Sequence, residues 1–186
     1  MLLPIVAYPH PVLRKQAEII PPDLPGLSTF LVDMWETMYH ADGIGLAAPQ
    51  VNRSLRLFVI DATVLSQHHH PETVGFKKTF FNATIYREEG EETLHNEGCL
   101  SFPGIHEDIF RKSIIHIRYL DEQFQEHDEQ YDGILARIIQ HEYDHTEGIT
   151  MAERLSPLKK MLLKRKLKDI AQGKVDVHYK MIFPFK

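Results

Sequence analysis

The chain has 186 residues, of which 43% are hydrophobic and 25% charged, which is typical of a soluble globular protein. Its net charge of −5 argues against wholesale nucleic-acid binding. No apolar run approaches the ~20 residues that span a bilayer, and the first residues lack the pattern of a signal peptide. We therefore expect one domain over residues 1–186, in the cytoplasm and with no membrane partner.

The N-terminal third is expected to contain two helices and a glycine-rich segment. Its first 25 residues are proline-rich, with room for a short helix over Val12–Glu18. Apolar residues at three- and four-residue spacing predict a long helix over Leu27–His40, with Ser28 as its N-cap. The segment Gly43–Gln50 follows, and its glycines suit either a plain turn or a backbone that approaches a ligand closely. Gln50 is the polar side chain at its end.

Strands are predicted next, separated by polar segments. Residues 61–77 read as a loop, which contains the tract His68-His69-His70. Such a tract can bind a metal ion, although a solvated loop is the commoner case and the one we favour. The acidic stretch Glu88–Glu92 predicts a turn. The strand segments themselves are Leu55–Ile60, Lys78–Tyr86 and Ser113–Leu120, and in the last of these His116 is expected to face solvent.

Cys99 is the only cysteine, so the chain forms no internal disulfide. A lone cysteine is most often a small buried hydrophobic residue, and this interpretation comes first. The surroundings of Cys99 weaken it, because Gly98 precedes the cysteine and a Pro-Gly turn follows at Pro103 and Gly104. A cysteine in such a turn-forming segment is poorly placed to be an ordinary residue of the hydrophobic core.

The sequence His141-Glu142-Tyr143-Asp144-His145 is predicted to lie on a helix from Asp132–Gly133 to Glu147, stopped by Gly148. Histidines four residues apart share one face, with Cβ atoms roughly 5–6 Å apart, so both rings can bind one metal ion. Glu142 can then act as a general base on a bound water. With 12 histidines in the chain the pattern also arises by chance, so a third ligand and a pocket must decide.

The same helix carries an apolar extension of the histidine row. Ile134 and Ile138 precede His141 by seven and three residues, which places them on the same face. They suit either a slot for an apolar substrate side chain or simple core packing, and both can be partly true. Arg137 points away from this row and is given no role.

The C-terminal region is predicted to hold one more helix and a terminal strand. Ser156 and Pro157 are typical of a helix start, and the helix runs to about Gln172. Residues 157–172 contain six basic side chains and one acidic one, a net charge of +5 that most often marks a solvated face. The tail Val175–Met181 alternates like a strand.

Three separated segments, in this order along the chain, closely resemble the signature motifs of peptide deformylase. They are Gly-Ile-Gly-Leu-Ala-Ala-Pro-Gln over residues 43–50, Glu-Gly-Cys-Leu-Ser over residues 97–101 and Gln-His-Glu-Tyr-Asp-His over residues 140–145. The resemblance extends from about His10 to Leu158, most of the chain. It replaces the core interpretation of Cys99 with a functional one.

The resemblance implies an α+β fold in which antiparallel strands wrap around the metal-binding helix. It implies hydrolytic removal of the formyl group from the N-terminal formylmethionine of new polypeptides. Ferrous iron is the first expectation for the metal, with Zn²⁺, Ni²⁺ and Co²⁺ as alternatives. Carried over by position, the metal ligands are Cys99, His141 and His145; the catalytic groups are Glu142, Gln50 and the Leu100 backbone N–H; and the substrate contacts are Ile44, Gly45, Ile134 and Ile138.

Three further hypotheses accompany this interpretation. Glu97 and Arg111 are expected to form an ion pair that orients the cysteine segment. The basic helix 157–172 is a candidate contact with ribosomal RNA, near the exit of nascent chains. As alternatives to the deformylase, the motif fits a zinc endopeptidase with another third ligand, and the fold fits a catalytically silent binding domain. The presence of all three ligands and Glu142 weighs against the silent domain.

Overall fold

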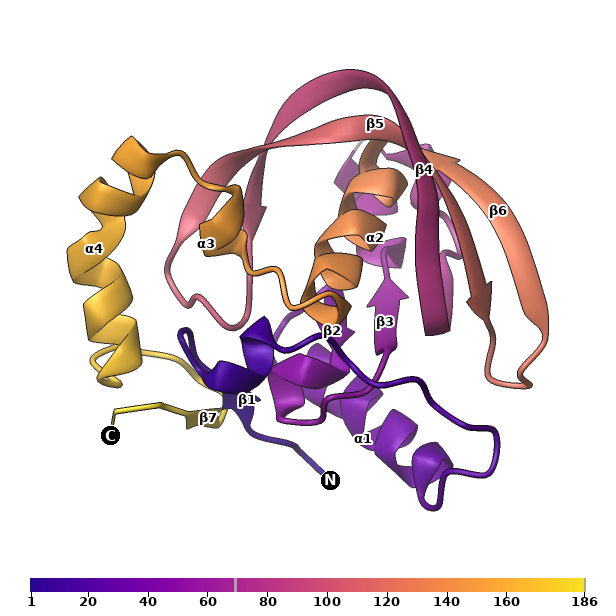
Figure 1. Cartoon of the computed structure of the whole chain (residues 1–186), viewed down its shortest axis with the longest axis horizontal. Coiled ribbons are helices and arrows are strands. Elements are labelled where there is room, and N and C mark those ends of the chain that lie inside the picture. Colours follow the sequence, from indigo (N-terminus) through magenta and orange to yellow (C-terminus); the bar gives the residue numbers. More distant parts are fainter. Residues whose placement is uncertain (69, 186) are drawn as a thin grey trace.

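An antiparallel five-stranded sheet forms the frame of the structure, a computed structural model that describes residues 1–68 and 70–185. The long strands β4 and β5 form a hairpin that arches over the molecule (Figure 1). In sheet order the strands are β2 (Gly45–Ala47), β3 (Leu57–Asp61), β4 (Lys77–Gly98), β5 (His106–Leu120) and β6 (Glu126–Asp132).

The helices do not alternate with the strands of this sheet along the chain: one precedes all five strands and the other three follow them. They are α1 (Leu27–His40), α2 (Gly133–Thr146), α3 (Met151–Arg154) and α4 (Pro157–Ala171). A second, two-stranded parallel sheet joins β1 (Ile5–Val6) to β7 (Met181–Ile182), close to both chain ends (Figure 1). The α+β class and the antiparallel main sheet are as expected.

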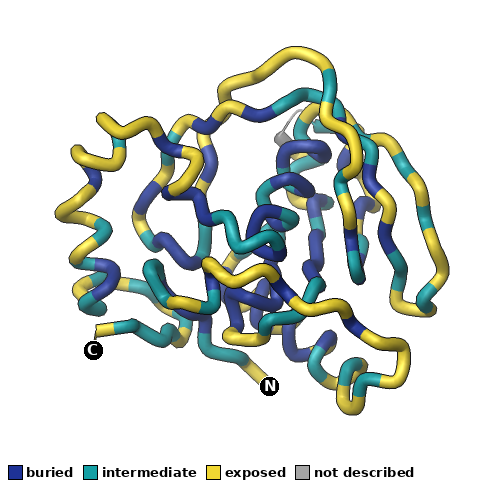
Figure 2. The backbone as a smooth tube through the Cα atoms, viewed as in Figure 1, coloured by how far each residue is buried: buried dark blue, intermediate teal, exposed yellow. Residues whose placement is uncertain are grey.

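Helix α2 is the most deeply buried helix (Figure 2). Its residues Leu135, Ala136 and Ile139 are at most 9% exposed and pack into one cluster with Phe58 and Ile117 of the sheet. The same helix also buries Gln140, Glu142, Asp144 and His145. Burying polar side chains is unfavourable unless they find partners, so their partners point to the function of the helix.

The helix predictions are largely confirmed. Helix α1 has the predicted bounds, and α2 and α4 agree to within one residue at each end. The Ser156 side chain caps α4 by accepting a hydrogen bond from the Lys159 N–H. The prediction of Ser28 as the N-cap of α1 is wrong, however. Gly26 occupies that position with a left-handed φ of 76°, and Ser28 lies inside the helix.

The predicted turn at Glu88–Glu92 is also wrong, because β4 continues through it. Gly90 has a φ of 78°, and the pairing of β4 with β5 shifts register between Glu89 and Glu92. The acidic stretch therefore makes a bulge, which bends a strand without reversing it. Strand β6 was not predicted, because the run Glu126–Asp132 is polar on both faces.

Short segments differ from the predictions as well. Pro11–Arg14 form a 3₁₀ helix where a helix over residues 12–18 was expected, and residues 61–77 include two 3₁₀ turns. Only Met181 of the predicted strand Val175–Met181 lies in a strand. In the tract His68-His69-His70, His69 lies outside the described residues. Among the residues that are described, no helix is both long and apolar enough to cross a membrane.

Candidate metal centre and active site

The three predicted ligands come together from two elements. Cys99 follows the end of β4, and His141 and His145 lie one turn apart on α2. The Cys99 Sγ lies 3.4 Å from the His145 Nε2, and one ligand atom from each of the three residues lies within 4.8 Å of the others. A tetrahedral ion bound at the usual distances to sulfur and nitrogen separates its ligand atoms by about 3.3–3.6 Å. The donor set therefore fits a single metal ion.

A buried carboxylate orients the first histidine. Glu97 Oε2 lies 2.9 Å from His141 Nδ1. A carboxylate accepts hydrogen bonds, so Nδ1 carries the proton and Nε2 is left for a metal. Burial alone would raise the pKa of Glu97, but the hydrogen bonds from His141 and Arg111 outweigh it and hold that pKa well below its usual value. Glu97 therefore stays ionised at neutral pH.

Arginines fix this carboxylate in turn. Arg111 binds both Glu97 oxygens, at 2.8 and 3.0 Å, and reaches Asp144 of α2 at 2.7 Å. The predicted ion pair between Glu97 and Arg111 is thus confirmed, while its role in orienting the cysteine segment stays a prediction. Breaking a buried pair of this kind by removing one partner usually costs about 3–5 kcal/mol, because an uncompensated charge remains.

Arg137 is a participant that the sequence analysis missed. It is buried, donates a 2.6 Å hydrogen bond to Glu97 Oε1, and also binds the carbonyls of Thr93 and Ile109. It precedes His141 by one helical turn, a spacing that makes two helical residues neighbours. That spacing from His141 was a signal in the sequence that could have been used. The bond to Glu97 makes Arg137 part of the network around the metal ligands.

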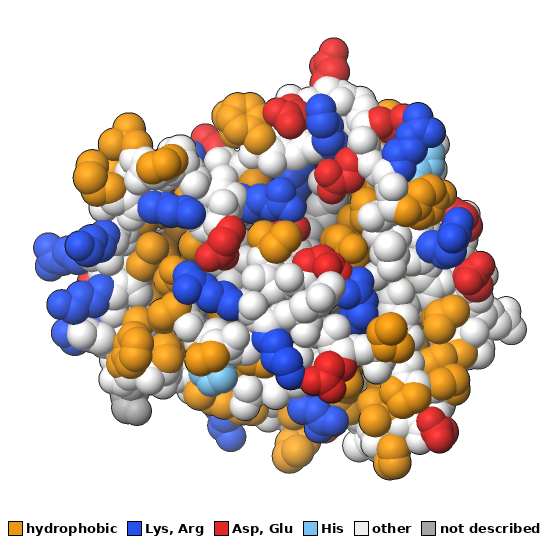
Figure 3. Space-filling model, viewed as in Figure 1, with side chains coloured by type: hydrophobic (Ala, Val, Ile, Leu, Met, Phe, Trp, Pro, Cys, Tyr) orange, Lys and Arg blue, Asp and Glu red, His pale blue; other side chains and the backbone are white. Residues whose placement is uncertain are grey.

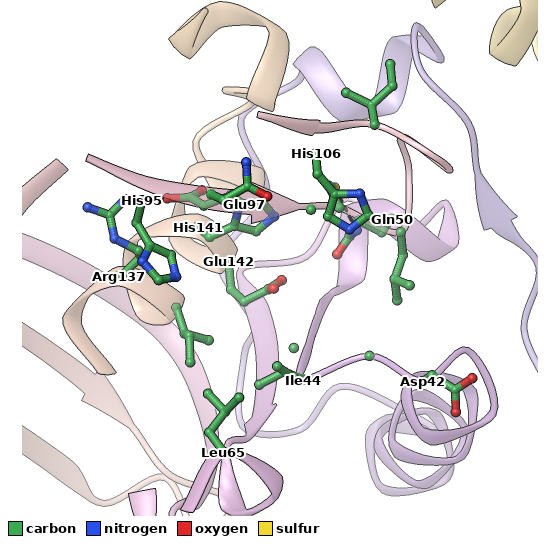
Figure 4. Close-up of a pocket in the computed structure, with 18 of the residues that line it drawn as sticks. Asp42, Ile44, Gln50, Leu65, His95, Glu97, His106, Arg137, His141 and Glu142 are labelled. Atoms are coloured by element: carbon green, nitrogen blue, oxygen red, sulfur yellow. Dashed lines mark hydrogen bonds and ion pairs between the residues drawn. The ribbon is translucent and has the colours of Figure 1, made fainter. Parts of the chain in front are cut away.

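Glu142 points into the pocket beside the ligands (Figure 4). It is 5% exposed, and within the described parts of the chain its Oε2 has no hydrogen-bond partner. Burial raises the pKa of Glu142 to about 7. A Cβ on Gly45 would lie 2.7 Å from the Glu142 carboxylate carbon, so a larger residue at position 45 would push the Glu142 side chain out of this position. The carboxylate is therefore free to exchange a proton with a group in the pocket.

Gln50 is held with its amide nitrogen toward the cysteine. Its Oε1 accepts a 2.8 Å hydrogen bond from the Ala47 N–H, so the opposite end must be the donor. Its Nε2 lies 3.6 Å from Cys99 Sγ and 3.4 Å from Ser101 Oγ. Leu100 follows the cysteine directly, and its carbonyl accepts a 2.9 Å hydrogen bond from Tyr179. The predicted donors thus lie beside the candidate metal position.

A pocket of about 410 Å³ opens onto these groups. In Figure 4 the Glu142 side chain lies between His141 and the apolar side chains of Ile44 and Leu65, and all four residues line the pocket. The four predicted substrate contacts Ile44, Gly45, Ile134 and Ile138 all line it, together with His95, Gly98, His106 and Tyr179. Strand β2 is at the edge of the sheet, so one side of it is open toward an extended ligand.

Comparison with known proteins gives consistent matches over nearly the whole chain. A peptide deformylase of Flavobacterium johnsoniae is 49% identical over 98% of this chain and 96% of its own length. One from Cytophaga hutchinsonii is 47% identical over the full length of both. The crystal structure of the Thermus thermophilus peptide deformylase superposes with a TM-score of 0.81 at 36% identity, over 94% of this chain and all of that one.

The sequence model of polypeptide deformylases matches residues 2–161, which include every predicted ligand and catalytic residue. The three motif segments are the ones that the structure places around one pocket. The chain belongs to the polypeptide deformylase family.

Proposed function

We propose that this protein removes the formyl group from the N-terminal formylmethionine of newly synthesised polypeptides and releases formate. The observation that carries the proposal is the convergence of Cys99, His141 and His145 beside a buried Glu142 carboxylate, at the end of an apolar pocket. Among the residues that the structure describes, the Glu142 Oε2 has no hydrogen-bond partner. The family membership supports the same reaction and does not favour the endopeptidase alternative.

We propose one divalent metal ion as cofactor, held by the thiolate and the two imidazoles. Such a mixed set accepts several first-row ions, and affinity order alone does not choose among them. Ferrous iron is our first candidate, with zinc, nickel and cobalt as alternatives. When bound, the ion lowers the pKa of a coordinated water toward about 7 and so supplies a nucleophile at neutral pH.

The protein groups then carry out the proton transfers and stabilise charge. Glu142 takes a proton from the attacking water and delivers it to the departing amine of methionine. Negative charge grows on the formyl oxygen, and donors fixed in advance stabilise it. The Gln50 Nε2 and the Leu100 backbone N–H are the groups we assign to that oxygen, because both lie beside Cys99.

The substrate is placed by the pocket wall and by a strand edge. Ile134, Ile138 and Ile44 offer an apolar slot for the methionine side chain. The Ile44 carbonyl accepts the Asp61 N–H at 2.8 Å on the β3 side. Successive residues of a strand bond in opposite directions, so the peptide groups of Gly45 face the open edge. The substrate backbone would pair there as an added strand.

Formate release from a short peptide tests this function. The metal-loaded protein is expected to release formate and a free amine from N-formyl-Met-Ala-Ser. It should leave N-acetyl-Met-Ala-Ser intact, and it should leave the peptide bonds of the unblocked peptide uncut. Cleavage of internal peptide bonds without formate release would instead support the endopeptidase.

Helix α4 suggests where the enzyme meets its substrate. Basic side chains gather over α4 on the surface (Figure 3), and the exposed ones include Lys160, Lys164, Arg165 and Lys168. We propose that residues 157–172 contact ribosomal RNA. Such contacts weaken steeply with salt. Substituting these four residues by glutamate is expected to abolish cosedimentation with ribosomes at low salt and to leave formate release from a free peptide unchanged. Undiminished cosedimentation would rule the contact out.

We further propose that residues 1–186 act as one catalytic domain in which the strands enclose α2. The pocket draws its lining from β2, the end of β4, α2 and the segment around Tyr179, which are far apart in the sequence. Because formylated chains arise at ribosomes, we propose the cytoplasm as the compartment.

A further inference from the structure

The C-terminal segment after α4 contributes Tyr179 to the lining of the pocket and then pairs with β1 through β7 (Figure 1). We propose that Tyr179 of this segment is a positioning residue that holds the Cys99–Leu100 turn. In this proposal, His178 anchors the segment to the end of α1 and to Asp42. This inference rests on the proposed function, because its effect is exerted through the Leu100 N–H assigned above.

The first support is how the turn after the cysteine is fixed. Three successive carbonyls each have their own donor: Cys99 accepts the Phe102 N–H at 2.8 Å, Leu100 accepts the Tyr179 hydroxyl at 2.9 Å, and Ser101 accepts the Tyr8 N–H at 3.0 Å. Of these three donors, only the Tyr179 hydroxyl belongs to a side chain; the other two are backbone N–H groups. Without the Tyr179 hydroxyl, Leu100 would lose the donor that fixes the peptide next to its own N–H.

The second support is the location of the Tyr179 ring. The ring is half-buried, packs against the hydrophobic cluster that includes Met38 and Leu46, and lines the pocket. Burial raises the pKa of Tyr179 to about 12, so its hydroxyl keeps the proton it donates. The hydroxyl is therefore a steady donor, delivered by a ring that the core already holds in place.

The adjacent residue secures the other wall. His178 Nε2 lies 3.0 Å from the His40 carbonyl at the end of α1 and 3.3 Å from Asp42 Oδ2. Asp42 leads directly into Gly43, where a Cβ would lie 2.9 Å from Leu100 Cδ1. The glycine segment and the cysteine turn are thus in contact. His178 binds the residue before the glycine segment, and Tyr179 binds the cysteine turn.

The test is Tyr179→Phe in the full-length, metal-loaded protein, which keeps the ring and removes only the hydroxyl. One neutral hydrogen bond that orients a transition-state donor corresponds to a fall in kcat of about 3–10-fold. We expect that fall in formate release, with KM within about twofold of wild type, metal content unchanged and Tm lowered by only a few degrees. Tyr86→Phe is the matched control and should leave kcat unchanged, since Tyr86 of β4 donates to Asp128 of β6 and neither residue lines the pocket.

Two results would overturn the inference. A kcat equal to that of wild type would make the hydrogen bond structurally incidental. A raised KM with unchanged kcat would make Tyr179 a wall of the substrate site only. His178→Ala is also expected to lower kcat. An unchanged kcat in that variant would show that His178 has no part in positioning the Cys99–Leu100 turn. Absence of formate release from wild type would instead contradict the proposed function, so the two failures are distinct.

Discussion

Replacing Glu142 with glutamine is expected to lower kcat for formate release by about 10²–10⁴-fold, the usual contribution of a general acid–base. Glutamine keeps the shape of the side chain and can form hydrogen bonds, but it cannot accept a proton from water. The Glu142 carboxylate is buried beside the ligands and lacks a partner among the described residues, so its removal leaves no broken ion pair. Metal content and fold should therefore be preserved.

The matched control is Glu91→Gln, which removes a carboxylate from the exposed part of β4. It should leave kcat unchanged. The measurement is the steady-state rate of formate release, with metal content determined on the same samples. A Glu142→Gln protein as active as wild type would remove the proposed proton transfer.

Replacing Cys99 with alanine is expected to lower metal affinity by at least ~100-fold and to abolish formate release. Changes to groups that merely orient ligands already cost 10–100-fold, so loss of a ligand should cost no less. Competitive titration with a chelator of known affinity measures the change. The two histidines would remain, but two ligands hold an ion far less firmly than three.

His116→Ala is the control for the cysteine variant. The His116 ring lies on β5 and its Nε2 is 2.8 Å from Glu89 Oε1, a half-buried pair rather than the solvated residue that was expected. It is absent from the pocket lining, so its removal should leave metal affinity unchanged. A protein that retained its metal without Cys99 and lost it without His116 would have another ligand set, as the endopeptidase alternative requires.

Much of the helical structure could be predicted because its signals are local. The cap at Ser156 and the stop at Gly148, with a φ of 73°, depend on residues within one turn. The bulge at Gly90 could not, because the stretch Glu88–Glu92 favours a turn locally. Its pairing with β5 is a tertiary contact that overrides this preference.

The chemical groups of the site were predictable for a related reason. The histidine pair is set by helical periodicity, and the ordered motifs supplied Cys99 and Gln50. The helical spacing of Arg137 from His141 could have indicated a place near the ligands, but the partners of Arg137 and of Tyr179 are distant in the sequence and could not be predicted. Arg137 reaches Glu97 across 40 residues, and Tyr179 reaches Leu100 across 79. No local pattern around Tyr179 encodes that contact, which forms only when the C-terminal segment returns to β1.

Formate release before and after metal exchange tests the metal-dependent deformylase most directly. The protein is prepared without oxygen, stripped by a chelator, and refilled separately with ferrous iron and zinc, with N-formyl-Met-Ala-Ser as substrate. We predict that release disappears on stripping and returns with one equivalent of at least one ion, most strongly with iron. Release that survives complete removal of the metal from folded protein would contradict the assignment of Cys99, His141 and His145 as the catalytic metal site.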